Sequence, residues 1–240
     1  MENYEEFLEA LEAEYDIYAA ECDAAMQMAL LKIRGLSSAF DRSDRRNPFD
    51  RIEYRIKTFK SVKGKCKAKG YELTSKSIQD NIKDVAGIRV ITRYLDEVNL
   101  VKEMIMQIPE VNIISVKDYI TTPKESGYSS IHLSCQVGVY DPFQGLRMRP
   151  LEIQIRTKSM NLWATLEHDI NYKSPFHVKE VDERFLHIAK ILRQLEDEAM
   201  ALRDICELIK GVPEGEDEAL NVLKLHQSNQ DKATQDSKIN

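Results

Sequence analysis

The chain has 240 residues, of which 42% are hydrophobic and 31% charged, and its formal net charge is −6 at pH 7. This composition is typical of an ordinary globular protein of one domain with appendages, and the acidic balance argues against a wide nucleic-acid-binding surface. No apolar run approaches the roughly 18 residues that a membrane-spanning helix needs, and the start of the chain is too acidic for a signal peptide, so we expect a cytoplasmic protein.

The first half of the chain shows two stretches with helical features. Apolar residues recur every three or four positions over residues 2–34, which predicts a helix that ends at Gly35. A polar stretch over residues 42–49 then predicts a loop. The strongly basic stretch over residues 51–69 is interpreted as a second helix, which ends at Gly70.

The second half contains the expected strands. Short β-branched runs predict strands over residues 85–91 and 111–116, with a helix over 97–108 between them. Residues 130–137 and 151–156 alternate between apolar and polar side chains, so each strand has one buried face and one face available for chemistry. Helical spacing returns over residues 159–172 and 180–209. The sum is an α+β fold with a mixed sheet of about five strands flanked by helices, including long N- and C-terminal helices.

These elements predict four regions along the chain. Residues 1–40 form an N-terminal helical region, 41–175 the main domain and 176–212 a C-terminal helix. Residues 213–240 form a flexible acidic and polar tail, whose last part, 227–240, has too few apolar residues to fold. The four cysteines are far apart and show no metal-ligand spacing, so we expect four reduced thiols.

Basic residues are concentrated in one stretch of this acidic chain. Residues 42–69 contain eleven lysines and arginines but only three acidic residues. Such a stretch favours a compact anionic ligand such as a nucleotide phosphate, although a solvated helix face would have the same composition. No glycine-rich phosphate-binding motif is present, so side chains would have to hold any nucleotide.

Two carboxylates are candidates for a metal site. Asp84 directly precedes the first predicted β-branched strand, and Glu152 lies on the polar face of the last strand. Two carboxylates from neighbouring strands, completed by phosphate oxygens and water, are ligands that Mg²⁺ prefers. The alternative is that either acid forms a salt bridge with Arg89 or Arg156.

A loop over residues 117–129 is the candidate ligand-binding loop, because it is basic, contains Pro and Gly, and leads into a strand. Tyr128 offers a flat ring on which a nucleotide base could stack, and Lys124 offers a positive charge for a phosphate. The alternative is a simple hairpin with a half-buried tyrosine.

Several long motifs resemble the synthetase domain of RelA/SpoT homologues, and most closely the stand-alone small alarmone synthetases. The motifs are RIKTFKS (55–61), DVAGIRV (84–90), KDYITTPKESGYSSIHL (117–133) and LEIQIRTKSMNLWATLEHDINYK (151–173). The resemblance implies a nucleotidyltransferase-like fold and an enzyme that transfers the β,γ-pyrophosphate of ATP to the 3′-hydroxyl of GDP or GTP. It also implies Mg²⁺ as cofactor and a homo-oligomer, with a tetramer as one form.

The resemblance assigns roles to individual residues of this chain. It implies that Asp84 and Glu152 hold the metal and are the catalytic pair, with Glu152 as the base for the 3′-hydroxyl. The ATP-binding residues would be Arg55, Lys57, Ser61, Lys65 and Arg89. The acceptor-binding residues would be Lys124, Tyr128, His132 and Gln154.

Three functions stay open at this stage. The first is (p)ppGpp synthesis, and the second is a toxin that pyrophosphorylates the 3′-CCA end of tRNA and is paired with an antitoxin. The third is an inactive nucleotide-binding regulatory module. The chain departs from the family pattern at Ser115, Glu125, Ser126 and Ser129, which cluster beside the expected acceptor site. These departures therefore bear on the identity of the acceptor, which is the point on which the first two hypotheses differ.

Overall fold

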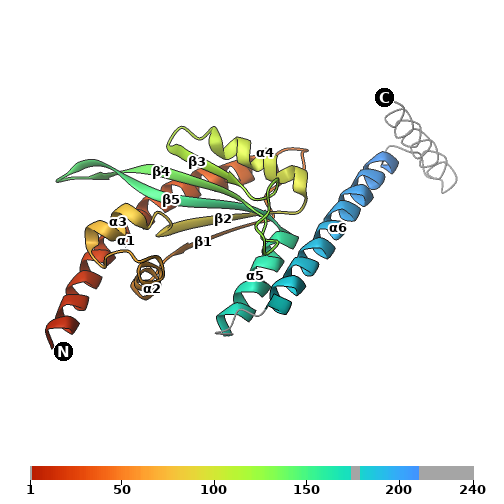
Figure 1. The fold of residues 1–240 in the computed structure, drawn as a ribbon. Coiled ribbons are helices and arrows are strands. Elements are labelled where there is room, and N and C mark those ends of the chain that lie inside the picture. Colours follow the sequence, from red (N-terminus) through yellow and green to blue (C-terminus); the bar gives the residue numbers. More distant parts are fainter. Residues whose placement is uncertain (1, 174–178, 211–240) are drawn as a thin grey trace, which may run out of the picture. The chain divides into compact units, whose positions relative to one another are not determined.

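The computed structural model describes residues 2–173 and 179–210 (Figure 1). Within these ranges the helices are α1 (Glu2–Asp41), α2 (Phe59–Lys69), α3 (Ser75–Asn81), α4 (Leu95–Met106), α5 (Lys158–Lys173) and α6 (Lys179–Ile209). The strands are β1 (Arg51–Ile56), β2 (Ala86–Thr92), β3 (Val111–Asp118), β4 (Ile131–Asp141) and β5 (Gly145–Thr157).

The described strands form a single mixed sheet in the order β1-β2-β5-β4-β3. Strands β2 and β5 are parallel, whereas the other neighbours are antiparallel. The prediction of an α+β fold with a five-stranded mixed sheet and long terminal helices is therefore confirmed. Strand β5 lies at the centre of the sheet, so residues on it have neighbours on both sides.

The hydrophobic core lies between one face of the sheet and the helices α1 and α4, which contact the central strands. The stripe of α1 that faces the sheet includes Met26, Leu30 and Ile33, all of which are fully buried. Leu133 and Ile153, from β4 and β5, are part of the same cluster. Each such side chain contributes about 1.5–3 kcal/mol on burial, so the core fixes which face of every strand points away from α1.

The predicted end of the first helix at Gly35 is wrong, because α1 continues to Asp41. Nothing lies within 4 Å of the position that a Cβ would take at Gly35, so this glycine meets no neighbour there. Leu36 and Phe40 beyond it still pack against the core. Their burial outweighs the cost of a glycine inside a helix, which is about 1 kcal/mol.

The single basic helix predicted over residues 51–69 is also wrong, because this stretch contains two elements. Residues 51–56 form β1, which pairs with β2 along its whole length. Helix α2 then starts after Thr58, whose hydroxyl accepts a hydrogen bond from the backbone N–H of Ser61, and it ends at Gly70 in the left-handed conformation. The basic stretch therefore supplies side chains from a strand and from a helix.

Other differences concern the limits of elements. The short helix α3 was not predicted, and β4 and β5 extend into a long hairpin beyond residues 130–137 and 151–156. The predicted tail of residues 213–240 and the predicted boundary at residues 175–176 lie outside the described residues.

The chain divides into a compact unit up to Lys190 and a second unit from Ile191, of which the structure describes the remainder of α6. No helix among the described residues is long and apolar enough to cross a membrane.

The cysteines differ in exposure, which gives a first testable prediction. Cys22, Cys66 and Cys135 are buried and Cys206 is exposed, and all four are free thiols. Burial raises the pKa of Cys22 to about 11 and that of Cys135 to about 12. In the native protein we expect one thiol to react rapidly with a thiol reagent at about pH 8 and three more only after unfolding. Cys206→Ser should remove the rapid phase, and two or more rapid thiols in the native protein would contradict this burial pattern.

Candidate active site

The register of the sheet brings the polar residues of four strands together on the face opposite α1. In one row, Arg55 of β1 is opposite Gly87 of β2, which is opposite Glu152 of β5. In the next row Glu53, Arg89, Gln154 and His132 are neighbours across β1, β2, β5 and β4. Because side chains alternate along a strand, both rows point to the same face.

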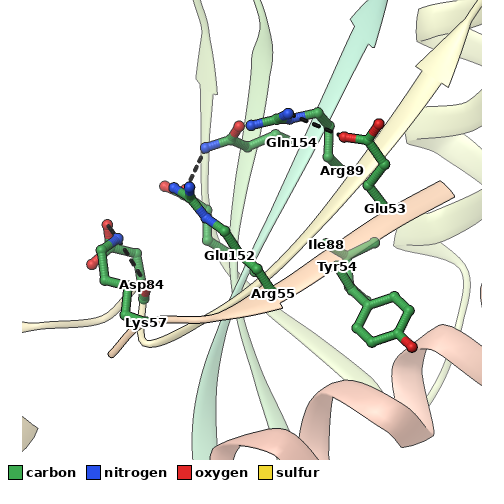
Figure 2. Close-up of a pocket in the computed structure, with 10 residues that line it drawn as sticks. Glu53, Tyr54, Arg55, Lys57, Asp84, Ile88, Arg89, Glu152 and Gln154 are labelled. Atoms are coloured by element: carbon green, nitrogen blue, oxygen red, sulfur yellow. Dashed lines mark hydrogen bonds and ion pairs between the residues drawn. The ribbon is translucent and has the colours of Figure 1, made fainter. Parts of the chain in front are cut away.

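Except for His132, the residues of these rows line a pocket with a volume of about 120 Å³. Figure 2 shows Lys57 and Asp84 at one end, Arg89 and Gln154 at the other, and Arg55 reaching in from β1. The lining residues are Glu53, Tyr54, Arg55, Lys57, Asp84, Gly87, Ile88, Arg89, Glu152 and Gln154. This volume suits a metal ion with phosphate groups, whereas the base and ribose of a nucleotide would have to lie over the rim.

Asp84 is held by two lysines at the start of the pocket. Its carboxylate accepts hydrogen bonds from Lys57 Nζ at 2.5 Å and from Lys65 Nζ at 2.8 Å. Burial alone would raise the pKa of Asp84, but the hydrogen bonds and charges of the two lysines outweigh it and hold that pKa below its usual value. The carboxylate is therefore ionised at neutral pH.

Glu152 accepts one hydrogen bond on each carboxylate oxygen. His132 Nδ1 lies 3.2 Å from Oε1, and Gln154 Nε2 donates to Oε2 at 2.6 Å. Burial would raise the pKa of Glu152, but these two contacts outweigh it and the pKa lies below its usual value. Glu152 is therefore an ionised carboxylate as well.

The alternative in which Arg89 or Arg156 neutralises one of these acids is not what the structure shows. Arg89 forms its ion pair with Glu53 at 3.1 Å. Arg156 donates instead to the hydroxyl of Tyr128 at 2.5 Å and to Oε1 of Gln154 at 2.6 Å. Asp84 and Glu152 thus face the same pocket, and the charge of Asp84 acts to raise the pKa of Glu152.

The donor set fits a hard divalent cation only in part. Two carboxylates lining one pocket are suitable oxygen ligands. The part of the chain that the structure describes contains no group of three or more His, Cys, Asp or Glu residues that could hold a metal. A cation held by Asp84 and Glu152 would therefore need further oxygens from a phosphate or from water.

The residues predicted to bind ATP do not all lie in the pocket. Arg55, Lys57 and Arg89 line it. The Nε atom of Arg89 is buried and has no hydrogen-bond partner in the structure, so this guanidinium has an unused donor. Lys65 reaches the pocket only through Asp84. Ser61 lies exposed on the first turn of α2 and is not among the residues that line the pocket.

The residues predicted to bind the acceptor lie next to the pocket, on the side of Glu152. Gln154 lines the pocket, and His132 is in contact with both Glu152 and the hydroxyl of Tyr128, at 2.7 Å from the latter. Lys124 Nζ lies over the ring of Tyr128, 4.8 Å from its centroid. A base can stack on this part of the ring only if the exposed Lys124 swings away.

The loop that carries Tyr128 is fixed by packing against two helices. The ring of Tyr128 makes an edge contact with Trp163 of α5, whose indole N–H donates to the backbone oxygen of Phe185 in α6. Gly127 has φ +89, and a Cβ there would lie 2.6 Å from the Cβ of Ala189. Only glycine fits this position, which explains the Gly-Tyr pair in the loop.

Glu53 and Gly87 were not singled out from the sequence, and Arg156 was considered only as a salt-bridge partner of Asp84 or Glu152. Glu53 pairs with Arg89, Gly87 leaves space between Arg55 and Glu152, and Arg156 contacts the acceptor side. Arg156 could have been recognised from the sequence, because it lies on the same face of its strand as Glu152 and Gln154. The signal for Glu53 depended on recognising β1 as a strand.

Comparisons with known proteins agree on one family. Residues 54–176 match the family model described as a region found in RelA / SpoT proteins. The GTP pyrophosphokinase YwaC of Bacillus subtilis is 35% identical over 158 residues, which cover 65% of this chain and 75% of that protein. The GTP pyrophosphokinase YjbM of the same organism is 32% identical over 183 residues, which cover 75% and 83%. The crystal structure of small alarmone synthetase 1 from Bacillus subtilis bound to its product pppGpp superposes with a TM-score of 0.73 at 28% identity, covering 79% of this chain and 96% of that one.

Proposed function

Since the chain belongs to the family that carries the region found in RelA and SpoT proteins, we propose that it transfers the β,γ-pyrophosphate of ATP to the 3′-hydroxyl of GDP or GTP and releases AMP. The observation that carries this proposal is the position of Asp84 and Glu152. Both line one pocket, with cationic side chains on the Asp84 side and an aromatic loop on the Glu152 side. Two nucleotides can thus meet at the pair of carboxylates.

The ATP side is formed by the basic residues of β1, β2 and α2. Arg55 and Arg89 project from adjacent strands, and planar guanidinium groups are suited to stack on an adenine. Lys57 and Lys65 bind the phosphates of ATP once their ammonium groups have released the carboxylate of Asp84. Asp84 and Glu152 would hold a Mg²⁺ ion, which neutralises phosphate charge when it is bound.

On the acceptor side, Glu152 takes the proton from the ribose 3′-hydroxyl. The new bond joins that oxygen to the β-phosphorus, while the bond between the β-phosphorus and the oxygen bridging it to the α-phosphorus breaks and AMP leaves. Because phosphoryl-type transfer needs little covalent help, positioning and charge neutralisation supply most of the rate acceleration. The fixed carboxylate of Glu152 contributes to this positioning.

The test is to incubate the protein with ATP labelled on the γ-phosphate and to offer GDP, GTP and tRNA separately. We expect label on a guanosine nucleotide. Label only on tRNA would overturn the proposal in favour of a tRNA-modifying toxin, for which an antitoxin partner should then be sought. Label on none of the three would favour the inactive regulatory module.

Tyr128→Ala should weaken use of the acceptor, because the flat ring is lost. Stacking between a base and an aromatic ring contributes about 1–3 kcal/mol, so the loss of stacking alone should lower the acceptor kcat/KM roughly 5- to 150-fold. The KM for ATP should change little. Tyr140→Ala is the matched control, because Tyr140 is 74% exposed on the β4–β5 hairpin. An unchanged kcat and KM for the acceptor would remove Tyr128 from acceptor binding.

A further inference from the structure

The buried guanidinium of Arg156 is linked to Glu152 by two separate paths. Arg156 is only 4% exposed, and its Nη2 atom donates to the Tyr128 hydroxyl and to Oε1 of Gln154. From Tyr128 the first path continues to His132 and then to Oε1 of Glu152. The second path runs from Gln154 Nε2 to Oε2 of Glu152. Both oxygens of the carboxylate are thus reached from one guanidinium.

The direction of every hydrogen bond in these two paths is fixed by the groups at their ends. Arginine can only donate hydrogen bonds, and an ionised glutamate can only accept them. Gln154 must therefore turn its oxygen to Arg156 and its NH₂ group to Glu152. Glu152 accepts from Nδ1 of His132, so Nε2 of the neutral ring can only accept. The Tyr128 hydroxyl therefore donates its single proton to Nε2, while its oxygen accepts from Arg156.

The same reasoning fixes the tautomer of His132. When Nε2 of the neutral ring accepts a proton from Tyr128, the ring proton must be on Nδ1, which is the atom that faces Glu152. Arg156 is the donor that anchors the far end of both paths. Without it, the oxygen of Tyr128 and Oε1 of Gln154 each lose a hydrogen-bond partner, and both side chains can leave the positions from which they reach His132 and Glu152. Glu152 thus sets the direction of the hydrogen bonds, and the planar fork of Arg156 holds both arms in place.

We infer that Arg156 is a positioning residue, which holds the Glu152 carboxylate in one orientation through the Tyr128–His132 arm and the Gln154 arm. The inference rests on the proposed function for the role of Glu152. Each carboxylate oxygen has two lone pairs, and the arms use one on each. The remaining lone pairs are free for the metal and for the proton of the acceptor hydroxyl, so that both partners meet the carboxylate at fixed angles.

Two variants test the arms without removing the residues that bind substrate. Arg156→Lys keeps the positive charge but replaces the planar fork by a point donor, which cannot serve both acceptors with the same geometry. Tyr128→Phe keeps the ring for stacking and removes only the hydroxyl, so folding and acceptor stacking should be retained. Arg147→Lys is the matched control, because Arg147 lies on the same strand outside the network and contacts Gln144 and Glu21.

The first readout is the tautomer of His132, measured by long-range ¹H–¹⁵N NMR at about pH 8.5, which also distinguishes a neutral ring from a protonated one. The His132 signal is assigned by its loss in His132→Gln. We expect the Nδ1–H form in the wild-type protein and in Arg147→Lys, and a mixture of tautomers in Arg156→Lys and Tyr128→Phe. An Nε2–H ring in the wild-type protein, or an unchanged tautomer in both variants, would overturn the inference.

The second readout is steady-state kinetics with ATP and the acceptor. We expect kcat to fall about tenfold or more in Arg156→Lys and in Tyr128→Phe, with each KM changed by no more than about threefold, because the carboxylate is misaligned while the substrates still bind. A change in KM alone, with kcat unchanged, would overturn the inference. If the wild-type protein proves inactive but the tautomer responds as expected, the inferred network stands and the proposed function fails.

Discussion

Glu152→Gln should reduce turnover by at least about three orders of magnitude while the protein stays folded. The amide has no negative charge for a metal and cannot take a proton, so the variant loses the base and a metal ligand together. It also offers one acceptor oxygen where His132 and Gln154 now find two. One of these donors must turn away, which costs about 1–3 kcal/mol of stability at most.

The measurement is kcat at saturating ATP and acceptor, with thermal unfolding followed in parallel. Folding should be retained because Leu151 and Ile153, the neighbours of Glu152 on β5, are buried on the opposite face of the sheet. Glu110→Gln is the matched control, because Glu110 is an exposed acid whose ion partner is Lys32. If Glu152→Gln keeps activity within tenfold of the wild type, Glu152 has no part in the mechanism.

Asp84→Asn is expected to have the second-largest effect, with kcat/KM for ATP reduced about 100- to 1,000-fold. The change removes one of the two carboxylates proposed to hold the metal, and a metal ligand of this kind contributes several kcal/mol. It also leaves Lys57 and Lys65, both of which now pair with Asp84, without their shared counter-charge. Their mutual repulsion should loosen the start of α2.

Initial rates measured over a range of Mg²⁺ concentrations separate the two consequences. Loss of a ligand predicts that half-maximal activity requires a higher Mg²⁺ concentration, whereas loosened lysines alone would raise the KM for ATP at every Mg²⁺ concentration. Asp80→Asn, at an exposed aspartate of α3, is the matched control. A variant with the wild-type Mg²⁺ dependence would exclude Asp84 as a metal ligand.

The sequence was most informative where the pattern is local. The alternation along residues 151–156 placed Glu152, Gln154 and Arg156 on one face, and the structure shows all three in the polar network. It was least informative at residues 51–56, where basic residues at helical intervals concealed a strand. That strand is defined by pairing with β2, a contact between residues distant in sequence, which the periodicity of a single segment cannot show.

The same distinction between local pattern and long-range contact holds for the residues of the site. Their strand faces could be predicted, but their partners could not, because partners depend on how the strands are brought together. Lys57 and Lys65 were assigned to phosphates from the resemblance, and in the structure both pair with Asp84. Glu53 and Gly87 gave no recognisable signal until β1 and β2 were placed side by side.

ATP labelled on the β-phosphate tests most directly which group is transferred. Pyrophosphate transfer moves the β-label to the guanosine nucleotide and leaves unlabelled AMP, whereas transfer of a single phosphate leaves the label on ADP. With GDP or GTP as acceptor, we predict labelled guanosine product and AMP in equal amounts. Labelled ADP, or labelled inorganic pyrophosphate with no labelled nucleotide product, would contradict the account.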